Sequence, residues 1–232
     1  MDYVALTRQS GLMKEMQVVA HNIANISTTG FRREGVVFAE HVKRLEGAPS
    51  LSMAAASGRH IDLAQAGITT TGAAFDLAIQ GEGFFAVQTP EGERLTRAGN
   101  FTPSAEGELV NGDGHMLLDL GGAPVFVPPD AAVAIAQDGT VSANGAPVAQ
   151  IGLFRPVVPL DLRHQGGTLF EAGEVEPVEG GVILQGSLEE SNVQPVIEIA
   201  RMIEVQRAYE LGQSFLDRED ERLRGLIQTL GR

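Results

Sequence analysis

Hydrophobic residues near the start of the chain recur at the spacing of one helix face. Intervals of seven, four, three, four and three residues separate the members of this set, which are Ala5, Leu12, Met16, Val19, Ile23 and Ile26. Such a seam is typical of a helix that packs lengthwise along another helix. Thr28, Thr29 and Gly30 follow, and Gly30 stands where a left-handed residue is needed after the last turn. The pattern predicts an N-terminal helix that these three residues cap.

A second helical pattern occupies the opposite end of the chain. Intervals of three and four residues separate the members of a second seam, which are Met202, Val205, Tyr209, Gly212 and Leu216. The same register returns nearer the end of the chain at Leu223, Leu226 and Leu230. Ser191 and Asn192 are candidate N-caps, and Pro195 falls in the first turn, where its missing N–H costs little. We predict a helix over residues 193–231, a rod of about 55–60 Å at 1.5 Å per residue.

Between these two segments, short apolar runs alternate with turn dipeptides such as Asp138-Gly139 and Asn144-Gly145. Asn-Gly and Asp-Gly supply the positive φ angles that tight hairpins require. The runs that read as strands are residues 84–87, 125–127, 148–154 and 181–184. The middle of the chain is therefore predicted to be an antiparallel β domain.

The two terminal helices have no helical neighbour along the sequence. Because an isolated amphipathic helix is marginal in water, each needs a partner that covers its apolar face. The predicted fold class is α+β, with the terminal helices paired as a coiled coil and an all-β domain inserted between them. The predicted domains are a coiled-coil domain of residues 1–40 and 186–232, an extended linker or hairpin at 41–75, rich in Ala, Ser, Gly and Thr, and an acidic β domain at 76–185.

Charge is distributed unevenly along the chain. The sequence has 30 acidic and 17 basic side chains. Residues 76–179 hold 15 of the acidic and 4 of the basic ones, a net charge of −11, which leaves −2 for the remainder. A surface of this sign repels phosphate backbones and anionic lipid, and no basic patch offsets it. The apolar runs are shorter than the roughly 20 residues that span a bilayer. We expect no nucleic-acid partner, no membrane-spanning segment and no cleaved signal peptide.

The sequence lacks the usual carriers of catalytic chemistry. It has no Cys, which excludes a thiolate nucleophile, a Cys-ligated zinc and an iron–sulfur cluster. No Gly-x-Ser-x-Gly nucleophile elbow occurs. The histidines show neither HExxH nor His-x-His spacing; they are His21, His41, His60, His115 and His164. We expect no catalytic residue, no cofactor, no metal site and no small-molecule substrate.

Two glycine-rich turns imitate ligand loops. Gly81-Glu82-Gly83 begins like a dinucleotide loop, but the third glycine and the following helix pattern are missing. Asn111-Gly112-Asp113-Gly114 is similar to a calcium loop, but apolar residues occupy the next ligand positions. Both are interpreted as turns. The many carboxylates of the middle segment could still furnish an acid–base pair for glycan hydrolysis. A secreted β-rich glycan-active enzyme and a monomeric adaptor are therefore kept as alternatives.

Several sequence blocks resemble those of the bacterial flagellar rod and hook proteins, and they occur in the family's order. The terminal blocks are AHNIANISTTGFR at residues 20–32, QGSLEESNV at 185–193 and QRAYE at 206–210. The blocks between them are IQGEGFFAV at 79–87 and LTRAGNF at 95–101. Within the family, the length, the first six residues and the compact middle are most similar to the proximal rod subgroup. The distal rod subgroup is next.

The resemblance implies a structural subunit of the axial drive shaft, and no enzyme. Members of the family are exported unfolded by the flagellar type III apparatus, without signal cleavage, and polymerise in the periplasm with copies of themselves and other rod proteins. The expected location is the periplasmic rod of the basal body. Two features depart from the family pattern: His21 stands where an Asn or similar polar residue is frequent, and the segment at 51–66 is short beside that of the distal rod and hook proteins.

From the seams and the resemblance we predict a set of subunit-interface residues. They are Leu12, Met16, Val19, Asn22, Ile23, Asn25, Ile26, Thr28, Thr29, Gly30, Phe31, Asn192, Met202, Val205, Gln206, Arg207, Tyr209, Leu216 and Leu223. Asn22 and Asn25, one turn apart, could hydrogen-bond across subunits or remain solvated amides. The turn at Gly30 is equally compatible with an intrachain role, and Arg97 with a salt bridge inside the β domain.

Overall fold

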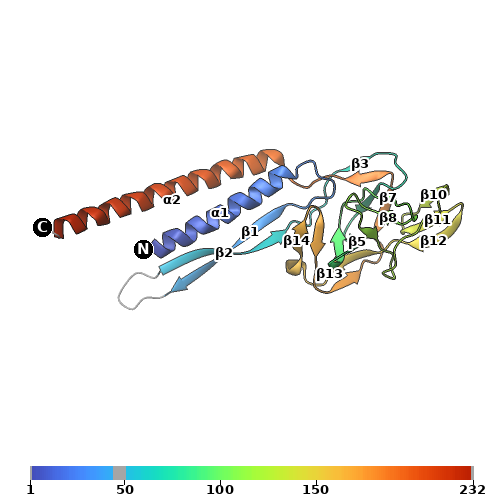
Figure 1. The fold of residues 1–232 in the computed structure, drawn as a ribbon, viewed down its shortest axis with the longest axis horizontal. Helices are drawn as coiled ribbons and strands as arrows, with labels where there is room; N and C mark the ends of the chain where they lie inside the picture. The colour runs from blue at the N-terminus through green and yellow to red at the C-terminus, as the bar shows by residue number, and fades with distance from the viewer. Residues whose placement is uncertain (1, 44–50, 231–232) are drawn as a thin grey trace. The chain divides into compact units, whose positions relative to one another are not determined.

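The computed structural model describes residues 2–43 and 51–230 of the chain. Helix α1 (Asp2–Ala24) lies at the start and helix α2 (Pro195–Leu230) at the end, with β-strands between them (Figure 1). The strands of the inserted segment pair in antiparallel fashion wherever their register is described. The predicted α+β class is therefore confirmed.

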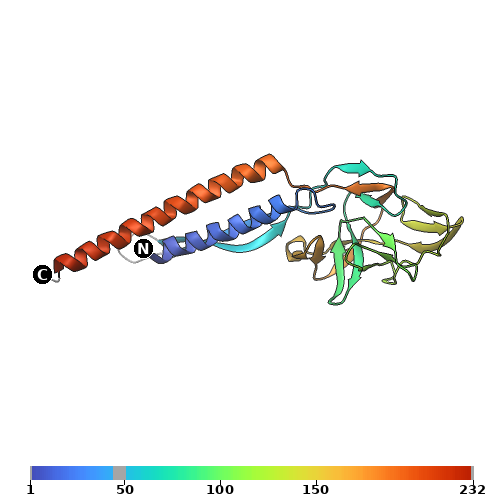
Figure 2. The ribbon, with the colours of Figure 1, turned by 45° about the horizontal axis from the view of Figure 1, so that its top comes forward.

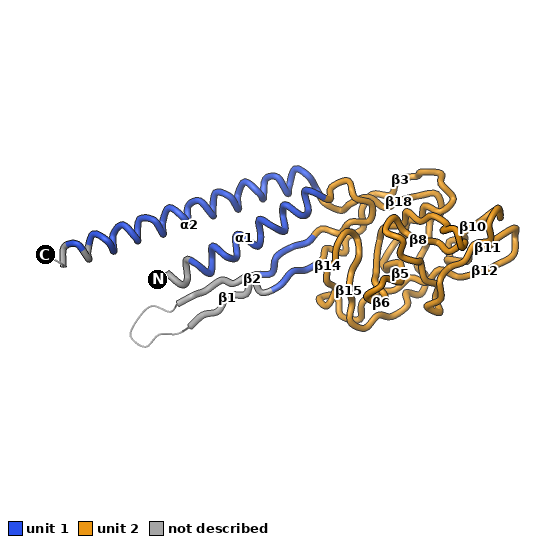
Figure 3. The backbone as a smooth tube through the Cα atoms, in the orientation of Figure 1, with its two compact units in different colours: residues 1–24, 34–60, 194–232 blue, residues 25–33, 61–193 orange. Residues whose placement is uncertain are grey.

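The chain folds into two compact units (Figure 3). Unit 1 consists of Met1–Ala24, Glu34–His60 and Gln194–Arg232, and unit 2 consists of Asn25–Arg33 and Ile61–Val193. The predicted extended segment at 41–75 includes residues 44–50, which lie outside the described residues. Its described part contains β2 (Leu51–Ile61) and β3 (Ile68–Thr70).

Unit 1 is built from the two helices and a two-stranded sheet. Helices α1 and α2 lie side by side in both views (Figures 1 and 2), and β1 (Glu34–Lys43) pairs with β2 and contacts α1. Val18, Val19 and Val205 are buried in this unit. Among the described residues, neither helix combines the length and the apolar character needed to cross a bilayer.

Helix α1 ends at Ala24, so the predicted extension through Ile26 is wrong. Asn25 and Ile26 lie in turns that follow the helix. Gly30 is left-handed as predicted, with φ of +68°, but it lies in the turn of unit 2 rather than at a helix cap. Glycine is required at this position by a tertiary contact, because a Cβ on Gly30 would lie 2.3 Å from the backbone N of Ala98.

Helix α2 begins with Pro195 in its first turn, as predicted. The carbonyl oxygen of Gln194 accepts the amide hydrogen of Glu198 at 3.1 Å, and this bond opens the helix one residue before the proline. The prediction of Ser191 or Asn192 as the N-cap is therefore wrong. Both residues precede the helix by three or more positions, and their side chains bond elsewhere.

Unit 2 is centred on a nine-stranded sheet. Its main path runs through β14 (Arg163–Gly166), β15 (Leu169–Glu171), β6 (Gly92–Thr96), β5 (Phe84–Thr89), β9 (Met116–Leu117), β8 (Leu109–Val110) and β7 (Thr102–Pro103). Strand β13 (Leu153–Pro156) joins this sheet through β5 and pairs also with β16 (Val175–Pro177). The short helix η1 (Pro159–Asp161) follows β13.

Smaller sheets complete unit 2. Strands β10 (Val133–Ile135), β11 (Thr140–Ala143) and β12 (Ala146–Gln150) form one of them. Strand β17 (Val182–Gln185) pairs with β4 (Leu77–Gln80), and β18 (Ser187–Glu189) pairs with β3. In the last two pairs, the final two strands of the β segment, β17 and β18, lie beside strands from its beginning, β4 and β3.

Three of the four predicted strands coincide with observed strands. Residues 84–87 lie in β5, and 181–184 overlap β17. Residues 148–154 overlap β12 and β13, which are separate strands. Residues 125–127 form no strand and make an isolated bridge at Phe126. Prolines flank this run at Pro124 and Pro128, and proline has no N–H for a strand ladder.

Strand β5 is buried on both of its faces. Phe85 and Val87 belong to one hydrophobic cluster, and Phe84 and Ala86 belong to another. The first cluster also contains Phe101, whose ring meets Phe85 edge-on. Both phenylalanines of the Phe84-Phe85 pair are therefore core residues of unit 2, which explains why this run is apolar throughout rather than alternating.

Candidate assembly site

The two helices of unit 1 pack with their chains running in opposite directions. Gln9 Nε2 donates to the carbonyl oxygen of Tyr209 at 3.1 Å, and Glu15, further along α1, meets Arg201, earlier on α2. Arg201 Nε donates to Glu15 Oε1 at 2.7 Å. Burial by itself lowers the pKa of Arg201, but the hydrogen bonds and charges of Glu15 and Glu204 together outweigh it and hold that pKa above its ordinary value.

The predicted seams are largely occupied by this packing within the chain. Val19 and Val205 are buried, and the partly buried members are Leu12, Met16, Ile23, Met202, Tyr209 and Leu216. Gln206, Arg207 and Leu223 are exposed. The side chains of Ala5, Leu226 and Leu230 lie outside the described residues. The seams therefore join α1 to α2, and their contact with sister molecules stays a prediction.

A second apolar row on α2 faces solvent, and we call it the outer strip. It consists of Val196, Ile197, Ile199 and Ile203. Val196 is 80% exposed and Ile203 is 44% exposed. Val196, Ile199 and Ile203 follow intervals of three and four residues, so the same periodicity that indicated the seam could have found the strip. Sequence reasoning missed it because it assigned α2 a single apolar face.

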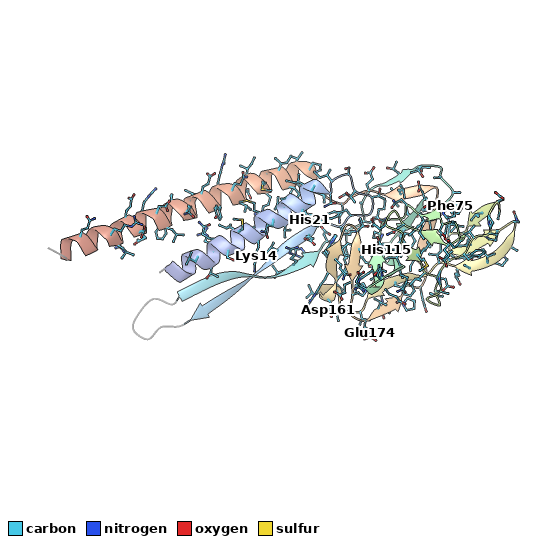
Figure 4. The ribbon with its side chains drawn as sticks, viewed as in Figure 1. Lys14, His21, Phe75, His115, Asp161 and Glu174 are labelled. Carbon is cyan, nitrogen blue, oxygen red and sulfur yellow. The ribbon has the colours of Figure 1, made fainter. Side chains whose placement is uncertain are left out.

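Asn22 is fully buried in unit 1, and its carboxamide is used within the chain. Its Oδ1 accepts the amide hydrogen of Glu34 at 2.9 Å, while its Nδ2 donates to the Glu34 carbonyl at 2.9 Å and to Glu198 Oε2 at 3.2 Å. The Glu34 carboxylate is also buried and lies 3.3 Å from Arg59 Nη1 and 3.6 Å from His21 Nδ1. His21 stands near the end of α1 (Figure 4). Asn22 thus ties α1 to the start of β1 and to α2.

The turn after α1 is closed by its own residues. The Thr28 hydroxyl donates to Asn25 Oδ1 at 3.0 Å, and the Thr28 amide donates to the Asn25 carbonyl at 3.2 Å. The amide of Phe31 then donates to the Thr28 carbonyl at 3.1 Å, and the Phe31 ring is fully buried beside His164. Thr29 is partly buried in the same turn. These hydrogen bonds and ring contacts all lie within one chain, so the turn has the intrachain role that the sequence left open.

A buried ion triad lies next to the turn in unit 2. Glu189 on β18 has Arg32 Nη2 at 2.5 Å from its Oε1 and Arg97 Nη1 at 3.0 Å from its Oε2. The amide of Ala66 donates to Glu189 Oε1 at 2.9 Å, and Arg97 Nη2 donates to the Gly81 carbonyl at 2.7 Å. Burial lowers the pKa of Arg97, while the charge of Glu189 opposes this change. Arg97 therefore makes its salt bridge within unit 2.

The triad connects segments that are distant in the sequence. Arg32 follows the turn after α1, Arg97 follows β6, and Glu189 ends β18. The Glu189 carbonyl also accepts the amide hydrogen of Gly30 at 2.8 Å. All three charged residues lie in sequence blocks that resemble the family, but their pairing could not be predicted, because the spacing of charges along a chain does not indicate which blocks meet in space.

Three family models match successive parts of the chain. Flagella basal body rod protein matches residues 3–32, Flagellar hook protein FlgE/F/G D1 domain matches 78–143, and Flagellar basal body rod FlgEFG protein C-terminal matches 184–229. The flagellar basal-body rod protein FlgF of Caulobacter vibrioides is 40% identical, over 99% of this chain and 97% of its own. The chain belongs to the flagellar basal-body rod protein family.

Further rod-family relatives align over nearly the same extent. FlgF of Mesorhizobium japonicum is 37% identical, covering 99% of this chain and 97% of the relative. The flagellar basal-body rod protein FlgG of Bacillus subtilis is 30% identical, covering 97% of each. The resemblance seen in the sequence blocks is confirmed. The rod family is structural, so the chain is a flagellar basal-body component and not a glycan-active enzyme.

Except for Glu34, the buried polar side chains described above fall within the ranges that the rod-family models match. Asn22 and Arg32 lie in the first range, Arg97 in the second, and Glu189 and Glu198 in the third. The three members of the buried ion triad, Arg32, Arg97 and Glu189, thus come one from each range. Within the described residues, no group of three or more His, Asp or Glu side chains is arranged to hold a metal ion.

Proposed function

We propose that this rod protein is a subunit of the proximal rod, which assembles with copies of itself and with other rod proteins into the drive shaft that transmits torque across the periplasm. The support for the proximal position is the identity of 40% and 37% to two FlgF proteins, against 30% to a FlgG protein. A subunit of the distal rod is the second candidate, because the FlgG alignment also spans 97% of each chain.

The observation that carries the proposal of self-assembly is the outer strip of α2. Exposed apolar patches on soluble proteins commonly mark interaction sites. The seam of α2 is already covered by α1, so the outer strip is a second, separate apolar face available to a neighbour. We propose that neighbouring copies pack on this strip and that the α1–α2 seam continues as a coiled coil in the assembled shaft. Among the predicted interface residues, Gln206, Arg207 and Leu223 are exposed on α2, so their side chains are also open to a neighbouring copy.

The proposed route to the periplasm is export of the unfolded chain by the flagellar type III apparatus. The chain contains no Cys, so folding after export requires no disulfide formation. A structural subunit transmits torque through many repeated contacts, and it needs interfaces rather than a reaction centre.

Ile203→Glu is expected to weaken assembly while the subunit stays folded. Burial of a whole Ile side chain contributes roughly 1.5–3 kcal/mol, and Ile203 is 44% exposed. Covering that exposed part contributes about 0.7–1.3 kcal/mol, which corresponds to about a 3- to 10-fold change in an association constant before the cost of burying the Glu charge is added. Ile203→Lys tests the opposite charge and should act in the same direction. The measurements are electron microscopy and sedimentation of mixtures with the other rod proteins, together with rescue of motility in a strain that lacks the protein.

The matched control is Val148→Glu. Val148 lies on β12 in unit 2 and is 44% exposed, the same fraction as Ile203. The proposal expects near wild-type assembly from this variant. Normal assembly of Ile203→Glu, or an equal loss in Val148→Glu, would contradict the role of the outer strip.

Assembly is also expected to strengthen with ionic strength. Residues 76–179 carry a net charge of −11, so copies placed side by side repel one another. Raising the salt from about 0.01 M to about 0.15 M shortens the Debye length from roughly 30 Å to roughly 8 Å and reduces this repulsion. Light scattering at the two salt concentrations measures the effect. Weaker assembly at the higher concentration would indicate attractive contacts between opposite charges instead.

A further inference from the structure

Asn192 joins backbone segments that are distant in the sequence. Its Oδ1 accepts the amide hydrogen of Arg33 at 2.6 Å. Its Nδ2 donates to the carbonyl oxygens of Asp62 and Ala64, each at 3.0 Å. One carboxamide therefore uses its acceptor and both donor hydrogens on three backbone groups, and all four residues belong to unit 2.

The three bonded segments lie where the chain passes between the units. Arg33 is followed by β1, Asp62 comes directly after β2, and Asn192 stands three residues before α2. The chain crosses between its units at four places in all, since the fourth crossing follows α1. Backbone hydrogen bonds join the same segments of unit 2: the Asp62 amide donates to the Arg33 carbonyl at 2.8 Å, and the Asn192 amide donates to the Phe31 carbonyl at 3.3 Å.

Asparagine is the residue type that this arrangement requires. A carboxamide offers one acceptor and two donor hydrogens on a short side chain, whereas aspartate offers acceptors only. Alanine would leave the Arg33 amide and both carbonyl groups without these bonds. An N-cap role would need a hydrogen bond from Asn192 to the first turn of α2. The described side-chain bonds of Asn192 go instead to the backbone just before β1 and just after β2.

We propose that Asn192 is a positioning residue that fixes, within unit 2, the backbone segments from which β1, β2 and α2 depart, and that assembly depends on it. A helical shaft repeats the same contacts between subunits, so these backbone segments must have the same conformation in every copy. This inference rests on the proposed function only for the role in assembly. The role in the free subunit is separate and can be measured without any assembly.

The first test is hydrogen exchange in the unassembled full-length protein. Asn192→Ala is expected to speed exchange of the Arg33 amide about tenfold, the change expected when one hydrogen bond no longer protects it. Asn192→Asp keeps the acceptor and loses both donors, so the Arg33 amide should stay protected in that variant. The matched control is Asn111→Ala. Asn111 Oδ1 accepts the amides of Asp113 and His115 in a hairpin turn of unit 2, and its loss should leave Arg33 exchange unchanged.

The second test is assembly with the other rod proteins. Both Asn192 variants are expected to assemble poorly, and Asn111→Ala normally. Poor assembly of Asn192→Ala with wild-type exchange at Arg33 would overturn the proposal and indicate a direct contact between subunits. Wild-type exchange and wild-type assembly together would overturn it as well. Failure of the wild-type protein to assemble would count against the proposed function, while the exchange result would still decide the positioning role.

Discussion

Glu189→Gln is expected to lower the free energy of unfolding by about 3–5 kcal/mol, the cost of removing one partner from a buried ion pair. Glu189 is the shared counter-charge of Arg32 and Arg97, and the side chains of all three are at most 3% exposed. Glutamine keeps the shape of the side chain but removes the negative charge that the two buried guanidinium groups share. Urea denaturation followed by circular dichroism measures the change as a shift of the unfolding midpoint.

The control for this variant is the next residue. Glu190 is exposed, and its Oε1 accepts the Thr69 hydroxyl at 2.7 Å. Glu190→Gln should change the free energy of unfolding by no more than about 0.5 kcal/mol. If Glu189→Gln cost less than about 1 kcal/mol, which is typical of an exposed pair, the triad would not hold its segments together as described.

Gly30→Ala is the second substitution with a large expected effect, a loss of about 2–5 kcal/mol in the free energy of unfolding. Left-handed backbone costs a non-glycine residue roughly 1–2 kcal/mol, and overpacking adds about 1–3 kcal/mol. The added Cβ would lie 2.3 Å from the backbone N of Ala98 and 2.3 Å from the carbonyl carbon of Arg97. These are backbone atoms, which cannot rotate away as a side chain can. Thermal and urea unfolding measure the loss.

Gly145→Ala separates the two contributions to that loss. Gly145 has φ of +83°, and a Cβ built on it would meet nothing within 4 Å. Its substitution should therefore cost only the backbone term of roughly 1–2 kcal/mol. Equal losses in the two variants would show that the approach of Gly30 to Arg97 and Ala98 does not contribute.

The parts of the fold that could be predicted from the sequence are those with a local signal. The seam through Met16 and Val19 indicated α1, and the seam through Met202 and Val205 indicated α2, because a helix repeats its faces every few residues. The turn dipeptides Asp138-Gly139 and Asn144-Gly145 marked the connections around β11, where Gly139, Asn144 and Gly145 have positive φ. The motif blocks indicated the family without any knowledge of contacts.

The errors occurred where a distant segment determines the local conformation. Ile26 continues the apolar spacing of α1, yet the helix ends at Ala24, and in the turn that follows the Gly30 amide donates to the Glu189 carbonyl. Asn192 has the composition of an N-cap, yet Arg33, Asp62 and Ala64 occupy its polar atoms. In both cases the competing hydrogen-bond partner is more than a hundred residues away in the sequence.

The sequence by itself determined the two terminal helices, the β character of the acidic middle, and membership of the rod family. Tertiary structure alone decided which polar groups meet: Asn22 with Glu34, Glu189 with two arginines, and Asn192 with the backbone next to β1 and β2. The physical reason is that periodicity and turn chemistry act over a few residues, whereas a buried polar side chain is satisfied by whichever backbone or charge the folded chain brings within 3 Å or so. The outer strip of α2 belongs to both classes, since its spacing is written in the sequence but its exposure follows from the face that α1 covers.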